Sequence, residues 1–210
     1  MRNAWKLSFV FLALAICFCR KPEPKYVPVD EKFISTPVEK ISIEAMKNLR
    51  VEVKTDYGSF TVGFYPDKAP HLTRNFIKLV QQGFYDGLRF HMVVPKYMVI
   101  GGDPKGDGQG GPGYWIKPDY NALPHTRGAF GMSHPPFAPD QIGSQFYVLL
   151  TDSFQKTNAY PVFGYVVSGM DVLDRIGDIG TTGPGEKPGP WIPKISVHIQ
   201  RMTILQKAGE

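Results

Sequence analysis

The chain has 210 residues and a formal net charge of +5, with 42% hydrophobic and 20% charged residues. This length suffices for one domain with a sizeable core, and the composition excludes a collagen-like, coiled-coil or globally disordered protein. The charged residues are scattered along the chain, which argues against the basic patch of a nucleic-acid-binding protein. We therefore expect a single folded domain, as a monomer, with no nucleic-acid partner.

Residues 1–19 have the features of an export signal. Arg2 and Lys6 give a basic start, and residues 7–18 form an apolar run that only Ser8 interrupts. A membrane-spanning helix needs about 20 apolar residues, so this shorter run at the N-terminus predicts a secretory signal peptide. The alternative is a buried N-terminal helix.

Both cysteines of the chain, Cys17 and Cys19, lie at the end of this apolar run. Residues two apart are poorly placed for a disulfide bond. The stretches LAIC and ICFC resemble the lipobox of bacterial lipoproteins, although Ile16 and Phe18 stand where that motif has a small residue. The resemblance implies lipidation at Cys17 or Cys19 and firm attachment to a membrane surface. The protein would then be exported and held in the cell envelope, facing the periplasm or the cell surface.

A proline-rich, charged segment follows at residues 20–48. Four prolines and many charged residues occur in RKPEPKYVPVDEKFISTPVEK. Segments of this composition stay extended and do not build a core. We therefore expect a tether with a reach of about 30 Å from an anchored end, and residues 41–48 are expected to form a short helix that leads into the domain.

The folded domain is predicted to span residues 49–207 and to begin with a β-hairpin. LRVEVKTD and SFTVGFY alternate apolar and polar residues, and DYG lies between them. Residues 69–83 then place apolar side chains on one face at helical spacing, with a proline in the first turn and a glycine after the last. These residues are expected to form an amphipathic helix against the core.

The remaining pattern predicts a mainly β domain. Strand-like runs occur at residues 88–94, 97–100, 128–133, 144–150, 162–167 and 195–206, and a second short helix occurs at residues 169–180. The pattern contains about eight strands but only two helices. Two helices are too few to connect the strands by repeated parallel crossovers. The pattern therefore favours a closed eight-stranded antiparallel barrel capped by two α-helices.

The stretch GGDPKGDGQGGPGY, residues 101–114, is the most unusual in the chain. It lacks the Lys-Ser or Lys-Thr of a phosphate-binding loop, and Asp103 and Asp107 do not have the spacing of a calcium-binding loop. The five histidines of the chain do not pair at metal-ligand spacing. We therefore expect no metal and no cofactor, and we interpret the glycines as supplying backbone shapes that other residues cannot adopt.

Several blocks of the sequence resemble blocks of the cyclophilin family and occur in the same order along the chain. FHMVVPKYMVIGGDPKGDGQGGPGY resembles the family signature, and APHLTRNFIKLV, HTRGAFGMS, GSQFYVLLTD and YPVFGYVVSGMDVLDRI resemble further blocks. The resemblance covers about residues 49–205, and the glycine loop is similar to that of bacterial members. It implies the cyclophilin barrel and peptidyl-prolyl cis-trans isomerase activity on proline-containing peptide segments.

The resemblance also implies the site residues. Met92 stands where the family has its catalytic arginine, and Ile100 stands where it has a glutamine. Tyr147 replaces the usual phenylalanine, and Tyr160 stands at a position that is histidine or tyrosine in the family. The implied catalytic positions are thus Met92 and Tyr160, and the implied substrate-binding positions are Tyr97, Met98, Ile100, Ser133, His134, Gln145, Tyr147 and Phe154.

The replacement of the family arginine matters for the chemistry. Rotation about an X-Pro amide crosses a barrier of about 18–20 kcal/mol, and in this family an arginine donates a hydrogen bond to the prolyl nitrogen. Arg89 lies an odd number of residues from Met92, so on a strand it would face the other side, as would His91. Arg74 and Arg127 lie elsewhere in the sequence and remain open as substitutes.

Three functions remain open at this point. The first is a prolyl isomerase that assists the folding of exported proteins, with activity reduced by the methionine at position 92. The second is a non-catalytic module on the cell envelope that binds proline-containing segments. The third is a surface lipoprotein that uses the barrel only as a scaffold.

Overall fold

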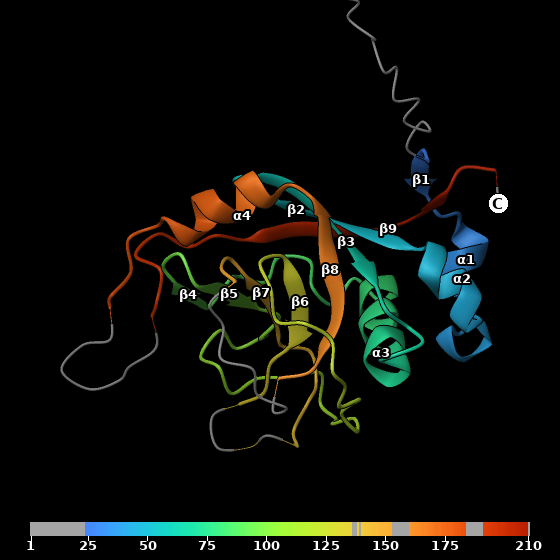
Figure 1. Ribbon diagram of the computed structural model, residues 1–210, viewed down its shortest axis with the longest axis horizontal. Coiled ribbons are helices and arrows are strands. Elements are labelled where there is room, and N and C mark those ends of the chain that lie inside the picture. Colours follow the sequence, from blue (N-terminus) through green and yellow to red (C-terminus); the bar gives the residue numbers. More distant parts are fainter. Residues whose placement is uncertain (1–23, 136–137, 139, 153–159, 184–190, 210) are drawn as a thin grey trace, which may run out of the picture.

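The computed structural model describes residues 24–135, 138, 140–152, 160–183 and 191–209. They form one nine-stranded sheet with helices packed against it (Figure 1). The predicted signal peptide and its two cysteines lie outside the described residues. Among the residues described, no helix is long and apolar enough to cross a membrane.

The predicted hairpin and first helix are confirmed. Strands β2 (Arg50–Thr55) and β3 (Gly58–Phe64) pair antiparallel. Helix α3 (Pro70–Gln81) follows, with proline at its start, where a missing N–H costs nothing. Its buried residues face the core, which makes α3 the amphipathic helix that the spacing predicts.

The other predicted strands and the second helix also form, with shorter bounds in several cases. The glycine loop separates the β4–β5 hairpin from the later strands. The elements are β4 (Met92–Val94), β5 (Met98–Gly101), β6 (Ala129–Met132), β7 (Phe146–Leu149), β8 (Val162–Ser168), α4 (Met170–Gly177) and β9 (Ile199–Lys207).

The expected closed eight-stranded barrel is not confirmed. The sheet has the order β1-β9-β2-β3-β8-β6-β7-β5-β4, and among the described residues its end strands β1 and β4 do not pair with each other. The segment before β4 instead contacts the segment before β9: the Phe90 N–H donates to the Val197 carbonyl at 3.0 Å, and Arg89 and His198 form an isolated bridge. These contacts curve the sheet round without a continuous ladder across the gap.

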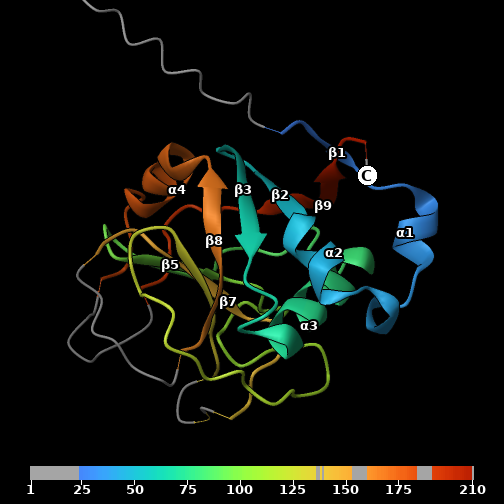
Figure 2. The ribbon, with the colours of Figure 1, turned by 45° about the vertical axis from the view of Figure 1, so that its right-hand side comes forward.

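The extra strand belongs to the segment that was expected to be a tether. Residues 24–48 instead contain β1 (Tyr26–Pro28), α1 (Glu31–Ser35), the 3₁₀ turn η1 (Val38–Lys40) and α2 (Ile43–Asn48). The short helix expected at 41–48 is therefore present, but an extended tether is wrong for residues 24–48. Strand β1 pairs with β9, and α1 and α2 lie beside α3 in both views (Figures 1 and 2).

Apolar side chains and two polar residues of α3 explain why this segment packs. Val38, Ile41 and Met46 are buried in the main core, so the segment carries enough apolar surface despite its prolines. Arg74 donates from Nη1 to the Val38 and Ile41 carbonyls at 2.7 and 2.8 Å. Gln81 donates in the same way to two carbonyls of the α1 region. These bonds tie the carbonyls at the ends of the short helical turns to α3, and the Val38 and Phe33 carbonyls accept them in addition to a backbone N–H bond.

A cation–aromatic contact also joins this segment to the sheet. The Arg50 guanidinium lies 5.1 Å from the ring centre of Tyr26 and 5.9 Å from that of Tyr165. Such contacts contribute about 0.5–2 kcal/mol when partly desolvated. Residues 24–48 are thus an integral part of the folded unit.

We predict that Arg74→Leu lowers the free energy of unfolding by about 1–3 kcal/mol, because the Ile41 carbonyl loses its side-chain donor and the Val38 carbonyl keeps only its backbone N–H bond. Urea unfolding of the purified protein measures this change. The control is Arg201→Leu. Arg201 is exposed, and its Nε forms a long ion pair of 3.9 Å with Asp86; exposed pairs of this kind contribute little to stability. Equal effects of the two substitutions would mean that Arg74 does not hold residues 24–48 in place.

Candidate functional site

Strands β4 to β8 present two different faces because successive side chains alternate across a sheet. Residues of one parity, such as Val93, Val99 and Val148, belong to the main core. Residues of the other parity gather on the opposite face, in what we call the second cluster. It consists of buried Ile100, Ala129, Tyr147, Leu149 and Val162 with partly buried Met92, Met98, Leu123 and Tyr160.

The strand register aligns this cluster into a row. Met92 pairs with Ile100, Ile100 with Tyr147, Tyr147 with Gly131, and Gly131 with Val162. One line of positions therefore crosses five strands, which span residues 92–168 of the sequence. The row is apolar except for the hydroxyl of Tyr147.

Gly131 leaves the gap in this row that the ring of Tyr147 fills. A Cβ at Gly131 would collide with the Tyr147 ring and hydroxyl, so only glycine fits. The Tyr147 hydroxyl reaches the backbone carbonyl of Tyr160 and donates to it at 3.0 Å. Burial raises the pKa of Tyr147 well above its ordinary value, so the hydroxyl keeps its proton. Tyr147, only 2% exposed, forms the floor of the cluster.

Tyr160 and His134 form one wall beside this floor. Their rings stack at 4.5 Å between centres with an angle of 14°. His134 Nδ1 lies 2.9 Å from the Pro135 carbonyl, and a carbonyl oxygen can only accept, so Nδ1 carries the proton. The wall is therefore flat and aromatic, which suits a proline ring.

Gln145 and Ser133 connect the cluster to the glycine loop. The Gln145 amide donates to the Gly108 and Gly110 carbonyls at 3.0 and 2.9 Å. The Ser133 N–H donates to the Gln145 carbonyl at 2.8 Å. The position of Gln145 beside the floor thus depends on the path of the glycine loop.

Asp103 holds that loop. Its carboxylate is 1% exposed and accepts backbone N–H bonds from Lys105 at 2.8 Å and Asp107 at 3.0 Å, and a further one from Gly108. Burial alone would raise the pKa of Asp103, but the backbone bonds hold it below its usual value. A Cβ at Gly110 would strike the carboxylate. The glycines are therefore needed to wrap backbone around a buried carboxylate, as the interpretation of the loop requires.

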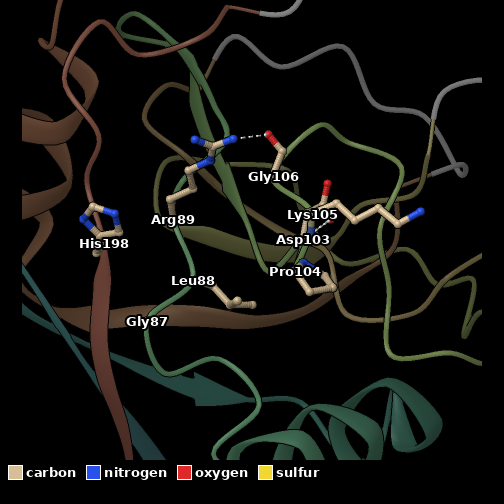
Figure 3. Close-up of a pocket in the computed structure, with 8 residues that line it drawn as sticks. All are labelled: Gly87, Leu88, Arg89, Asp103, Pro104, Lys105, Gly106 and His198. Atoms are coloured by element: carbon tan, nitrogen blue, oxygen red, sulfur yellow. Dashed lines mark hydrogen bonds between the residues drawn. The ribbon is translucent and has the colours of Figure 1, made fainter.

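Arg89 contacts the glycine loop and not the second cluster, although the strict alternation from which we expected this does not hold here: Phe90 lies in the main core and Met92 in the second cluster. Arg89 Nη2 donates to the Gly106 carbonyl at 3.1 Å, and Arg89 lines a hollow with the start of the glycine loop and His198 (Figure 3). His91, two residues on, is buried in the same direction, and burial lowers its pKa. Neither side chain replaces the family arginine at Met92.

The other candidate arginines are also engaged elsewhere. Arg74 binds the N-terminal segment, and Arg127 forms a two-bond ion pair with Asp174 at 2.6 and 2.9 Å. In the part of the chain that the structure describes, the hydrogen bonds, ion pairs and cation–aromatic contacts of each arginine lie outside the second cluster. These residues are Arg50, Arg74, Arg89, Arg127, Arg175 and Arg201.

The structure brings together most of the residues that the sequence singled out. Met92, Met98, Ile100, Tyr147 and Tyr160 share the second cluster, with Ser133, His134 and Gln145 around it. Tyr97 lies in the turn before β5, where its carbonyl accepts the Leu150 N–H at 2.9 Å, and it is not a member of the cluster. Phe154 lies outside the described residues, as do Cys17 and Cys19.

Sequence reasoning missed several residues of this region. Gly131 and Val162 complete the row, and Leu123 joins the cluster from the loop before β6. His125 donates from Nε2 to the Tyr160 carbonyl at 2.8 Å. No spacing in the sequence marks His125, because its partner lies 35 residues away.

This arrangement suits binding and holding better than bond-breaking chemistry. It combines an apolar floor with a flat aromatic wall. No group of three or more potential metal-ligating side chains occurs among the described residues. A site of this kind fits a small apolar ring with a peptide backbone on either side.

Known proteins share this fold and this sequence pattern. The family model "Cyclophilin type peptidyl-prolyl cis-trans isomerase/CLD" matches residues 50–203. Peptidyl-prolyl cis-trans isomerase B of Bacillus subtilis is 43% identical over 119 residues, which cover 55% of this chain and 82% of that protein. Peptidyl-prolyl cis-trans isomerase-like 1 of Aspergillus oryzae is 39% identical, covering 76% of this chain and 98% of that protein.

Longer relatives and a solved structure also match. The chain spans only 27% of the length of peptidyl-prolyl cis-trans isomerase-like 2 of Cryptococcus neoformans, to which it is 34% identical over 73% of its own length. A crystal structure of a Cryptosporidium parvum cyclophilin type peptidyl-prolyl cis-trans isomerase, in the presence of the dipeptide Ala-Pro, superposes with a TM-score of 0.66 at 25% identity. That match covers 74% of this chain and 98% of the other.

We predict that Asp103→Asn lowers the free energy of unfolding at pH 7 by about 1–3 kcal/mol, because backbone donors lose a charged acceptor. The folded pKa of Asp103 is lowered from 3.8. The contribution of the carboxylate is therefore full above about pH 5 and is lost as the pH falls through the folded value. Urea unfolding at pH 7 and below pH 3 should show the difference between wild type and variant shrinking. The control Asp107→Asn changes an exposed carboxylate that accepts one local bond; an equal loss there would contradict the role of Asp103.

Proposed function

Since this chain belongs to the cyclophilin-type peptidyl-prolyl cis-trans isomerase family, and so to a family of isomerases, we propose that it isomerises X-Pro bonds in other proteins. The observation that carries this proposal is the second cluster. It places Met98, Tyr147 and Tyr160 around one apolar surface. The Ala-Pro dipeptide named with the Cryptosporidium parvum structure supports a proline-containing ligand for this chain.

The physical task fits such a site. Unaided X-Pro isomerisation takes tens to hundreds of seconds, and it requires only that the amide be twisted while its flanks are held. The floor at Tyr147 and the wall at Tyr160 would hold the proline ring. No bond is made or broken, so no nucleophile or metal is required.

We expect this activity to be lower than that of relatives that keep the arginine. Removing one preorganised donor from a catalytic site costs about 2.7–4 kcal/mol, or about 10²–10³ in rate. Met92 is flexible and apolar, and Ile100 beside it offers no polar atom. The cluster thus retains the surface for a proline ring without the donor that speeds rotation.

The second candidate is a non-catalytic module that binds proline-containing segments. The same pair of residues favours it: Met92 and Ile100 face each other across the β4–β5 hairpin where the family has an arginine and a glutamine. Such a module would hold a client segment and release it unchanged. The two functions differ only in whether bound peptide exchanges faster between its isomers.

We also propose that the protein works in the cell envelope as a monomer. The basic start, the short apolar run and Cys17 or Cys19 support export with a lipid anchor, on the periplasmic side or the cell surface of a bacterium. Exported proteins that fold outside the cytoplasm would then be its clients. The anchor is tested by the incorporation of radiolabelled fatty acid into the wild type and into the Cys17→Ser, Cys19→Ser and double variants.

The decisive experiment is exchange NMR of an Ala-Pro test peptide with the purified protein. Faster cis-trans exchange at a protein concentration far below that of the peptide would establish catalysis. Shifts of protein signals without faster exchange would favour the binding module. The absence of both would reject both functions and leave the domain as a scaffold.

We predict that Met92→Arg raises kcat/KM, by up to about 10²–10³-fold if the guanidinium reaches the prolyl nitrogen. Met92 is partly buried on the face of the second cluster, so an arginine stem can lie along the row. The same exchange measurement gives the rate.

The matched control for this gain is Val94→Arg. Val94 lies on the same strand and face as Met92 but pairs with Met98 in the next row. The Val94→Arg substitution adds the same charge without placing it opposite Ile100. A rise in both variants would show that charge alone increases activity, and no rise in either would show that Ile100 also prevents catalysis.

A further inference from the structure

One backbone carbonyl beside the second cluster accepts two side-chain hydrogen bonds. The Tyr160 carbonyl lies 2.8 Å from His125 Nε2 and 3.0 Å from the Tyr147 hydroxyl. The two donors come from different parts of the fold, the loop before β6 and strand β7. A carbonyl oxygen has two lone pairs, so both bonds are accommodated.

Both donors are fixed in the donating state. Because a carbonyl only accepts, the proton of the His125 ring that faces it must be on Nε2. Burial raises the pKa of Tyr147, which keeps its hydroxyl protonated. His125 is 9% exposed and Tyr147 is 2% exposed. Both bonds are partly buried, so water competes less for them than at the surface, and losing either donor leaves the carbonyl less well satisfied.

The carbonyl belongs to the residue whose ring forms the wall of the site. The Tyr160 ring stacks on His134, and its centre lies 6.3 Å from the centre of the Tyr147 ring, with the two ring planes at 86°. Next along the chain, the Pro161 carbonyl accepts the Met132 N–H at 3.0 Å and joins this segment to β6. Fixing the Tyr160 backbone thus fixes the distance between wall and floor.

We propose that His125 and Tyr147 are positioning residues that set the width of the proline site by clamping the Tyr160 carbonyl. This inference rests on the proposed function of the second cluster. It also gives a role to the tyrosine that replaces the usual phenylalanine at position 147: its hydroxyl is a clamp donor, and Gly131 provides the space that its ring occupies. His125 acts through Tyr160 and does not touch the substrate.

Tyr147→Phe and His125→Leu test the clamp, each removing one donor. We expect the aromatic NMR signals of Tyr160 and His134 to shift in both variants without substrate. We expect KM for an Ala-Pro peptide to rise about two- to tenfold while kcat changes little, because a looser wall weakens ground-state and transition-state binding alike. His125→Gln keeps an N–H donor and should restore much of the wild-type KM. The double variant should lose less than the sum, because both bonds end on one oxygen.

Tyr85→Phe is the matched control, since its buried hydroxyl donates to the Ser144 carbonyl at 3.2 Å in the main core. It should lower stability without moving the Tyr160 and His134 signals. Unchanged signals and KM in Tyr147→Phe and His125→Leu would overturn the clamp. Absence of peptide binding by the wild type would reject the proposed function instead, while the ring signals of the free protein would still decide whether the clamp exists.

Discussion

The alternation of side chains across strands β4 to β8 is the constraint on which the rest of this protein depends. One parity of residues fills the main core and the other builds the second cluster. A slip of one residue in any of these strands would exchange the two sets. The pairing of Met92 with Ile100, and of Ile100 with Tyr147, therefore fixes the core and the candidate site together.

Buried polar groups then hold the loops that the sheet itself does not order. The Asp103 carboxylate accepts hydrogen bonds from backbone N–H groups of the glycine loop. The Gln145 amide donates hydrogen bonds to two carbonyls of the same loop. The Tyr160 carbonyl plays the opposite part, as an acceptor for two side chains. In both places one acceptor, the Asp103 carboxylate or the Tyr160 carbonyl, determines the position of a segment, because leaving its hydrogen-bond partners unpaired is costly.

The N-terminal segment shows how composition can mislead. Its prolines and charges favour an extended chain, yet Val38, Ile41 and Met46 are buried. Arg74 and Gln81 on α3 satisfy its backbone. The segment therefore lengthens the sheet by β1 and adds two short helices beside α3 (Figure 2). If the protein is anchored through residues before this segment, the domain begins its fold close to the anchor.

The sequence by itself determined the hairpin, helix α3, the order of the strands along the chain and, through family resemblance, the positions around Met92, Tyr147 and Gln145. These features are encoded by short-range periodicity and contiguous motifs. It could not determine that residues 24–48 pack on the domain, that β1 and β4 do not pair with each other among the described residues, or that His125 meets Tyr160. Those outcomes depend on contacts between residues far apart in the chain. Likewise, only the tertiary structure decided that Arg74 and Arg127 are engaged elsewhere, because a side chain's partners are set by packing and not by its neighbours in sequence.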